Sequence, residues 1–169
     1  MQRVLIAGSS GAGKSTLARS LSEQLGLPYV ELDSLFHGPD WTPRPSFLDD
    51  VSAVAAGDRW VSEYQYPAAR PLLLARADTL IWLDYRRFTV MQRVIRRSAV
   101  RAVTRRPMFN GNTERFAAWR QPDHPMRHTW RNHASFEQRV LADLPAQLPV
   151  IRLHSPAETR RWLNRSGLV

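Results

Sequence analysis

Short apolar runs alternate with amphipathic stretches along this chain of 169 residues. The apolar runs predict five strands, at residues 3–7, 29–32, 60–61, 79–83 and 149–153. The amphipathic stretches predict helices at residues 14–25, 46–56 and 86–105, another that begins at Pro125, and a last one after the capping box at 155–158. Strands that alternate with helices indicate a parallel sheet covered by helices on both faces.

Apolar residues indicate which side of each long helix faces the core. In helix 86–105 the residues expected on that side are Phe88, Met91, Val94, Ile95 and Ser98. In the helix that begins at Pro125 they are Met126, Trp130, His133, Val140, Leu141 and Leu144. Residues 34–45 hold four prolines or glycines and are predicted to form a loop. We expect residues 1–169 to form a single domain.

Composition narrows the class of protein. Hydrophobic residues make up 43% of the chain, which is typical of a folded domain. The absence of cysteine excludes disulfide scaffolds, thiolate metal sites and cysteine nucleophiles. The sequence shows neither an apolar run of roughly 18 residues, the length of a membrane span, nor a secretory signal pattern. We therefore expect a cytoplasmic protein with no membrane partner.

The first predicted strand runs into a glycine-rich loop, Gly8-Ser9-Ser10-Gly11-Ala12-Gly13-Lys14-Ser15, which fits G-x-x-x-x-G-K-[ST]. Such a P-loop points backbone N–H groups at phosphate oxygens, while its lysine reaches the β- and γ-phosphates and its serine offers a hydroxyl to Mg²⁺. The alternative, a chance glycine-rich turn, does not account for the strand before it and the helix after it. The residues assigned to the nucleotide here are Gly8, Ser10, Gly11, Ala12, Gly13, Lys14, Ser15 and Thr16.

The chain is strongly basic, with a formal net charge of +9, and Lys14 is its only lysine. Between Asp84 and Glu114 it has eight arginines and no acidic residue. Four of the arginines are spaced four apart and form a row that we expect opposite the apolar face of their helix: Arg93, Arg97, Arg101 and Arg105. The row is either a solvated basic face or a surface that binds an anion.

In the anion-binding interpretation, Arg97 and Arg101 act as catalytic residues that neutralise charge on the transferring phosphoryl group. Residues 107–112 would then be the hinge of a lid, at about residues 97–124, that closes over the nucleotide and excludes water.

Acidic residues at the carboxyl ends of strands are the candidates on the acceptor side, because ligands bind there in open α/β sheets. Asp33 would orient or deprotonate an attacking hydroxyl, and a turn or helix cap is its alternative role. Glu63 and Asp84 end the third and fourth predicted strands, and either would help Ser15 to hold Mg²⁺. Capping of the arginine-rich helix is the alternative for Asp84.

Aromatic residues near this edge are candidates to stack on a base or sugar. Trp41 lies in the proline-rich loop, within an acceptor-binding segment that we place at about residues 34–58. Tyr64 and Tyr66 are further candidates, whereas Trp60 begins a buried strand and is expected in the core. The five histidines show no convincing metal-ligand spacing.

Taken together, several stretches resemble the small P-loop kinases related to adenylate kinase, and within them the group often labelled topology modulation protein. The resemblance covers nearly the whole chain. The stretches that carry it are the P-loop, Glu31-Leu32-Asp33, Pro39-Asp40-Trp41, Arg59-Trp60-Val61, Ala77 to Asp84, Asn110-Gly111-Asn112-Thr113-Glu114 and Arg152-Leu153-His154-Ser155-Pro156. The chain departs from that group where Glu63-Tyr64-Gln65-Tyr66 replaces an Asp-Gly-x-Tyr-like stretch.

The resemblance implies a three-layer P-loop NTPase fold, with a five-stranded parallel sheet in the order 2-3-1-4-5 and a mobile, arginine-bearing lid. It also implies an ATP-dependent phosphotransferase. Contacts to the nucleotide base are implied near the turn after the fifth strand, where Arg152 is the candidate residue.

We therefore predict a kinase that binds ATP and Mg²⁺ and phosphorylates a small acceptor: a nucleotide, a nucleoside or another hydroxyl compound. Two alternatives stay open. Net charge and the arginine row favour a nucleic-acid-associated ATPase or regulator, although no nucleic-acid-binding motif is found. The altered Glu63-Tyr64 stretch keeps open a nucleotide-binding protein with little turnover. The sequence specifies neither the acceptor nor the oligomeric state.

Overall fold

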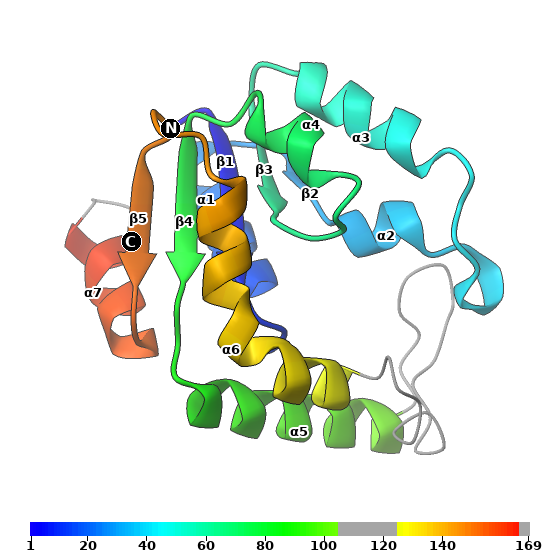
Figure 1. Cartoon of the computed structure of the whole chain (residues 1–169), viewed down its shortest axis with the longest axis vertical. Helices are drawn as coiled ribbons and strands as arrows, with labels where there is room; N and C mark the ends of the chain where they lie inside the picture. Colours follow the sequence, from blue (N-terminus) through cyan, green and yellow to red (C-terminus); the bar gives the residue numbers. More distant parts are fainter. Residues whose placement is uncertain (105–124, 166–169) are drawn as a thin grey trace.

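The computed structural model describes residues 1–104 and 125–165. Five strands form one parallel sheet in the order β2-β3-β1-β4-β5 (Figure 1). They are β1 (Arg3–Gly8), β2 (Tyr29–Val30), β3 (Trp60–Glu63), β4 (Thr79–Leu83) and β5 (Val150–Leu153). The expected sheet and its strand order are thus confirmed.

Helices follow the strands and cover the sheet. They are α1 (Lys14–Leu25), α2 (Leu32–Phe36), the 3-10 turn η1 (Pro39–Trp41), α3 (Phe47–Ala56), α4 (Arg70–Leu74), α5 (Arg87–Thr104), α6 (Pro125–Asp143) and α7 (Pro156–Arg165). In Figure 1, α5 lies across the end of the sheet toward which β4 and β5 point. Among the described residues, every helix falls short of the length and apolarity that a bilayer crossing requires.

Alternate residues of the strands face two separate cores, as the side-chain period of two requires. Val4 and Ile6 of β1 pack on one side, with residues of α1, α7 and the first half of α5. Leu5 and Ala7 pack on the other side, with residues of α2, α3, α4 and α6. The molecule therefore has the three-layer architecture that the sequence predicts.

Two short helices were not predicted. Residues 29–32 were expected to form one strand, but the strand ends at Val30 and α2 begins at Leu32. Helix α4 also lies where no element was expected. Each of these helices has only five residues, too few to show a helical period in the sequence. Buried leucines, Leu32 in α2 and Leu73 in α4, hold them on the sheet.

The predicted core face of α5 is wrong in part. Phe88 and Ile95 are 72% and 47% exposed, whereas the buried positions are Val90, Val94, Ser98 and Ala102. The side chains of α5 offer two apolar stripes, and the P-loop packs against the one that contains Val90 and Val94. In α6, Val140 is buried as predicted, but Trp130 and Leu141 are more than half exposed.

Candidate nucleotide and acceptor site

The P-loop turns tightly between β1 and α1 and lies against α5. Gly11 and Gly13 have φ values of +85° and +101°, which side-chain-bearing residues rarely adopt. A Cβ atom at Gly11 would lie 2.4 Å from Val94 Cγ2 and 2.9 Å from the carbonyl oxygen of Val90. Position 11 thus requires glycine for its backbone conformation and for its contact with α5.

The first turn of α1 lies beside Glu63, the last residue of β3. Glu63 Oε1 accepts hydrogen bonds from the Ser15 hydroxyl at 2.7 Å and the Tyr29 hydroxyl at 2.8 Å. Its Oε2 atom lies 4.0 Å from Lys14 Nζ, and both Lys14 and Glu63 are buried. Burial lowers the pKa of the Lys14 ammonium, while the carboxylates of Glu63 and Asp33 act in the opposite direction. The lysine, the hydroxyl and the carboxylate that the sequence singled out are therefore brought together.

Ser15 and Glu63 form an oxygen pair of the kind that suits Mg²⁺. Proteins commonly hold this ion through one or two side-chain oxygens, and phosphates of the substrate complete its shell. Within the described part of the chain, no group of three or more His, Cys, Asp or Glu side chains could hold a metal ion. The Ser15–Glu63 pair thus fits a Mg²⁺ ion that takes its remaining ligands from a nucleotide and water.

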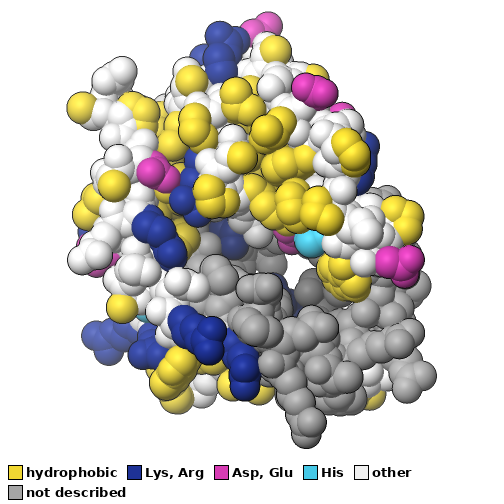
Figure 2. Space-filling model, turned by 45° about the vertical axis from the view of Figure 1, so that its right-hand side comes forward, with side chains coloured by type: hydrophobic (Ala, Val, Ile, Leu, Met, Phe, Trp, Pro, Cys, Tyr) yellow, Lys and Arg dark blue, Asp and Glu magenta, His cyan; other side chains and the backbone are white. Residues whose placement is uncertain are grey.

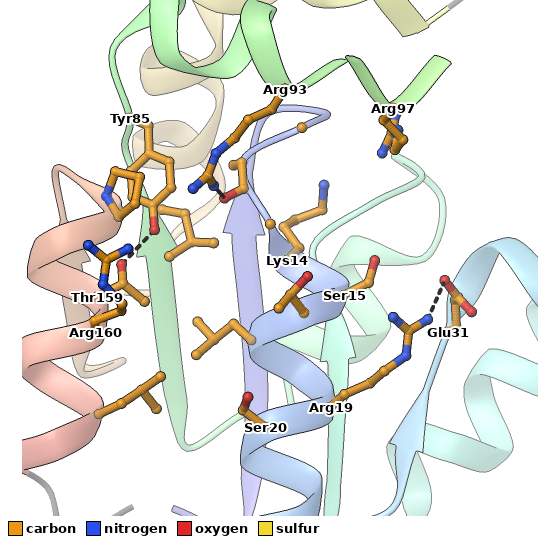
Figure 3. A pocket seen from close by; sticks show the side chains of 18 residues that line it. Lys14, Ser15, Arg19, Ser20, Glu31, Tyr85, Arg93, Arg97, Thr159 and Arg160 are labelled. Atoms are coloured by element: carbon orange, nitrogen blue, oxygen red, sulfur yellow. Dashed lines mark hydrogen bonds and ion pairs between the residues drawn. The ribbon is translucent and has the colours of Figure 1, made fainter. Parts of the chain in front are cut away.

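A cavity of about 640 Å³ extends from the P-loop toward α7 (Figure 3). This volume lies within the range of about 300–1,000 Å³ that small-molecule pockets occupy. Tyr85 and Thr159, joined by a 2.6 Å hydrogen bond between their hydroxyls, lie at one end. Figure 3 shows the Arg160 side chain on α7 beside this end, and Lys14 and Ser15 between it and the Arg19–Glu31 ion pair.

Two arginines of α5 contact the P-loop directly. Arg93 Nη1 donates to the Ala12 carbonyl oxygen at 3.1 Å, and Arg97 Nη2 donates to Ser10 Oγ at 2.9 Å. Both side chains also line the cavity. For these two residues, the prediction that the arginine row lies opposite the apolar face is wrong, because Val94, between them in the sequence, packs against the same loop.

Other parts of the predicted lid cannot be placed. Arg101 lies on α5, but its side chain is outside the described residues. The same holds for residues 105–124, which include Arg105, the hinge at 107–112 and most of the lid at 97–124. Their roles stay predictions.

Asp84 and Arg152 do not line the cavity, although the sequence suggested Asp84 for Mg²⁺ and Arg152 for the nucleotide base. Arg152 binds Asp84 Oδ2 through Nε and Nη2, at 2.9 and 2.7 Å, and also binds Glu137 at 2.5 Å. Its guanidinium lies 4.1 Å from the centre of the Trp82 ring. Trp82 belongs to the core beneath α6, on the opposite face of the sheet from α1. This ion cluster ties β4, β5 and α6 together.

Asp33 lies in the first turn of α2, at the carboxyl end of β2. Its Oδ1 atom accepts a 2.6 Å hydrogen bond from the Tyr66 hydroxyl, which also lies 3.3 Å from His37 Nε2. Burial, followed by the Asp33 carboxylate, raises the pKa of the Tyr66 phenol, so this hydroxyl stays a donor. Asp33 and Tyr66 are thus one hydrogen-bonded unit.

The aromatic candidates separate into two groups. Trp60 and Tyr64 are buried in the core, and the Tyr64 hydroxyl donates to Asp143. Trp41 is 39% exposed and packs edge-on against His37, near Tyr66. Only Trp41 and Tyr66 therefore lie on the acceptor side, as far as the described residues show.

Sequence reasoning missed several residues of the site. Tyr29 was assigned only to a strand, and Tyr85, Thr159, Arg160 and Arg19 were not singled out, although they line the cavity or bind Glu63. Tyr29 could have been found from its strand, because β2 is parallel to β3 and pairs Tyr29 with Val61, two residues before Glu63. The residues of α7 gave no local signal.

Solved structures of known kinases share this architecture. A shikimate kinase from Acinetobacter baumannii, in complex with shikimate, superposes with a TM-score of 0.59 over 99% of this chain and 92% of its own, at 14% identity. A shikimate kinase from Bacteroides thetaiotaomicron gives a TM-score of 0.56 over 98% of each chain, at 13% identity. The chain has the fold of the P-loop kinases.

Sequence comparisons give partial likenesses to two bifunctional enzymes. A bifunctional pantoate ligase/cytidylate kinase from Gloeobacter violaceus is 30% identical over 102 residues, and one from Synechococcus is 35% identical over 52 residues. These matches span 57% and 31% of this chain, but only 18% and 11% of the relatives' lengths. No protein-family model matches the chain. The P-loop kinase fold is therefore established, whereas the finer placement beside adenylate kinase stays a prediction.

Proposed function

We propose that this protein is a kinase that transfers the γ-phosphoryl group of ATP to a hydroxyl group of a small acceptor. The observation that carries the proposal is the meeting of three features at one edge of the sheet. The P-loop with buried Lys14 follows β1, Glu63 ends β3 beside Ser15, and Asp33 follows β2 in its bond with Tyr66. Donor-side and acceptor-side groups are thus neighbours.

On the donor side, the P-loop amides and the Lys14 ammonium would hold the phosphates of ATP. Ser15 and Glu63 would hold Mg²⁺, which when bound neutralises phosphate charge. Arg97, whose guanidinium donates to Ser10 of this loop, would meet the transferring group. Arg160 and the Tyr85–Thr159 pair are our candidates for contacts to the base end, in place of Arg152.

On the acceptor side, Asp33 would orient the attacking hydroxyl and accept its proton. The hydroxyl oxygen forms a bond to the γ-phosphorus as the bond between that phosphorus and the β,γ-bridging oxygen breaks, and ADP leaves. The proton passes to the Asp33 carboxylate and then to water. Because Oδ1 of Asp33 accepts the hydrogen bond from the Tyr66 hydroxyl, Oδ2 would be the oxygen that meets the acceptor.

The experiment is to measure ADP release from Mg·ATP with a panel of nucleosides, nucleoside monophosphates and small hydroxyl metabolites, with duplex DNA as one member. We expect one small molecule to stimulate release, and Lys14→Ala to lower kcat by at least about a hundredfold, because it removes a charge that contacts the transferring group. Arg161→Ala, which changes an exposed arginine of α7 outside the cavity, is the control and should match the wild type.

Two outcomes would refute the proposal. Turnover of Lys14→Ala within a few-fold of wild type would remove the assigned donor site. Stimulation by DNA alone would instead favour a nucleic-acid-associated ATPase.

A further inference from the structure

Tyr29 reaches the buried carboxylate of Glu63 from the neighbouring strand. Parallel β2 and β3 pair Tyr29 with Val61, and both side chains pack on the α1 side of the sheet. Glu63 follows Val61 by two residues on that same side, which corresponds to about 6.6 Å of strand. A tyrosine hydroxyl covers this distance and a short side chain does not. The 2.8 Å hydrogen bond from Tyr29 to Glu63 Oε1 therefore follows from the register of the strands.

The backbone and the ring of Tyr29 are both held in place. The Ser62 hydroxyl donates to the Val30 carbonyl oxygen at 3.0 Å, which fixes β2 against β3 directly after Tyr29. The Tyr29 ring is half-buried against the core on the α1 side. The Arg19 guanidinium lies 5.9 Å from the centre of this ring and pairs with Glu31 at 3.8 Å. The position of the Tyr29 hydroxyl is thus determined by contacts other than its bond to Glu63.

The two oxygens of the Glu63 carboxylate face different groups. Oε1 accepts both the Tyr29 bond and the 2.7 Å bond from Ser15, whereas Oε2 lies 4.0 Å from Lys14 Nζ. That separation is at the outer limit of an ion pair. Glu63 is only 3% exposed, so water has little access to its carboxylate. Two hydroxyls on one oxygen therefore hold the carboxylate beside the first turn of α1, short of close contact with the lysine.

Positive groups lie close to this carboxylate. Figure 2 shows Lys and Arg side chains gathered on the lower part of the molecule, where α5 lies in Figure 1. Burial, and to a smaller extent the Arg97 guanidinium of α5, lower the pKa of the Lys14 ammonium, while Glu63 and Asp33 raise it. A glutamate side chain is flexible, and without a restraint Glu63 would be drawn onto the lysine that the phosphates of ATP require.

From these contacts we infer that Tyr29 is a positioning residue of the nucleotide site, whose hydroxyl holds Glu63 beside Ser15 so that the carboxylate stays available to Mg²⁺ while Lys14 binds the phosphates. This inference rests on the donor site proposed above. Without the Tyr29 hydroxyl, Glu63 would gain rotational freedom and would turn to Lys14, and the binding of Mg²⁺ would have to reverse both changes. Tyr29 acts through Glu63 and is not expected to contact ATP or the metal ion.

The test is calorimetric titration with a non-hydrolysable ATP analogue, once with saturating Mg²⁺ and once with a chelator. The ratio of the two dissociation constants measures what Mg²⁺ contributes to binding. Tyr29→Phe keeps the ring and removes the hydroxyl. We expect it to lower this ratio roughly three- to tenfold, because the restraint on one flexible side chain is lost. An unchanged ratio, including one in which affinity falls equally with and without Mg²⁺, would overturn the inference.

Two comparisons separate positioning from a role in packing. Tyr64→Phe also removes a tyrosine hydroxyl that donates to a carboxylate, that of Asp143, but in the core on the other face of the sheet. Its ratio should match the wild type. In the Glu63→Gln background, Tyr29→Phe should change the ratio by less than about twofold, because its effect depends on the Glu63 charge. Equal losses with and without Glu63→Gln would overturn the inference.

Phosphoryl transfer is measured separately with the acceptor panel, so the two proposals can fail independently. If no acceptor is phosphorylated but Tyr29→Phe lowers the ratio as expected, the kinase function is refuted and the role of Tyr29 is supported. If transfer occurs and the ratio is unchanged in Tyr29→Phe, the kinase function stands and the role of Tyr29 is refuted. Absence of any Mg²⁺ effect in the wild type would also refute the role of Tyr29.

Discussion

The contact between the P-loop and α5 gives a prediction whose size follows from the structure. Gly11→Ala would place a side chain on a residue with φ +85°, at a cost of about 1–2 kcal/mol. Its Cβ would also lie 2.4 Å from Val94 Cγ2. Overpacking of this kind costs about 1–3 kcal/mol. We therefore expect Gly11→Ala to lower the free energy of unfolding by about 2–5 kcal/mol.

A second substitution separates the two causes. Val94→Ala removes the atom that clashes and by itself costs about 2 kcal/mol, since Val94 is fully buried. In the double variant the clash with Val94 Cγ2 is relieved, whereas the 2.9 Å approach to the Val90 carbonyl oxygen remains. The loss of stability should therefore be smaller than the sum of the single losses by about 1–3 kcal/mol. The strain of the positive φ remains in both backgrounds.

The assay is denaturant unfolding of the wild type, the two single variants and the double variant, with ATP affinity measured alongside. Val51→Ala supplies the control, because Val51 is equally buried but belongs to the core on the other face of the sheet. In the double-mutant cycle of Val51→Ala with Gly11→Ala, the losses of unfolding free energy should be additive to within about 0.5 kcal/mol. An additive cycle between Gly11 and Val94 would show that α5 does not confine the P-loop as described.

Two further predictions concern Glu63 and Tyr64. Glu63→Gln keeps an acceptor for the Ser15 hydroxyl but removes the negative charge, so Mg²⁺ should strengthen ATP binding about tenfold less than in the wild type. ATP titrations with Mg²⁺ and with a chelator measure this difference. An unchanged effect of Mg²⁺ would exclude Glu63 from the metal site. Tyr64→Phe removes the hydroxyl that donates to Asp143, so the free energy of unfolding should fall by about 1 kcal/mol while kcat is unchanged. An altered kcat at full stability would contradict the placement of Tyr64 in the core.

Local pattern was sufficient to predict a parallel sheet and the P-loop, whereas the strand order was implied by the family resemblance. Both depend on residues that are adjacent in the chain: an apolar run, a glycine-rich turn and an amphipathic helix. The five-residue helices α2 and α4 could not be predicted, because burial of Leu32 and Leu73 against the sheet, rather than periodicity, holds them. The side of α5 that faces the core depends equally on a distant partner, the P-loop at Gly11.

Strand periodicity separates Glu63 from Asp84 only once the face of the sheet that α1 covers is known. Val61 faces the α1 side of the sheet, so Glu63, two residues later, faces the first turn of α1. Trp82 faces the α6 side, and Asp84 follows it with the same parity. Either strand end is plausible from composition alone. The deciding information is which face α1 covers, which the sequence does not state.

Positive charge is a poor guide to the anion site in this arginine-rich chain. Arg152 has the same parity as Trp82 and is bound by Asp84 and Glu137 on the face away from the cavity. Arg93 and Arg97 belong to the site because the P-loop packs on the side of α5 that carries them. The charge of a guanidinium held by carboxylates is largely compensated by them, whereas a neutral loop carbonyl or hydroxyl leaves the positive charge of its guanidinium uncompensated. Arginines of the second kind, rather than the total of +9, mark where the nucleotide would bind.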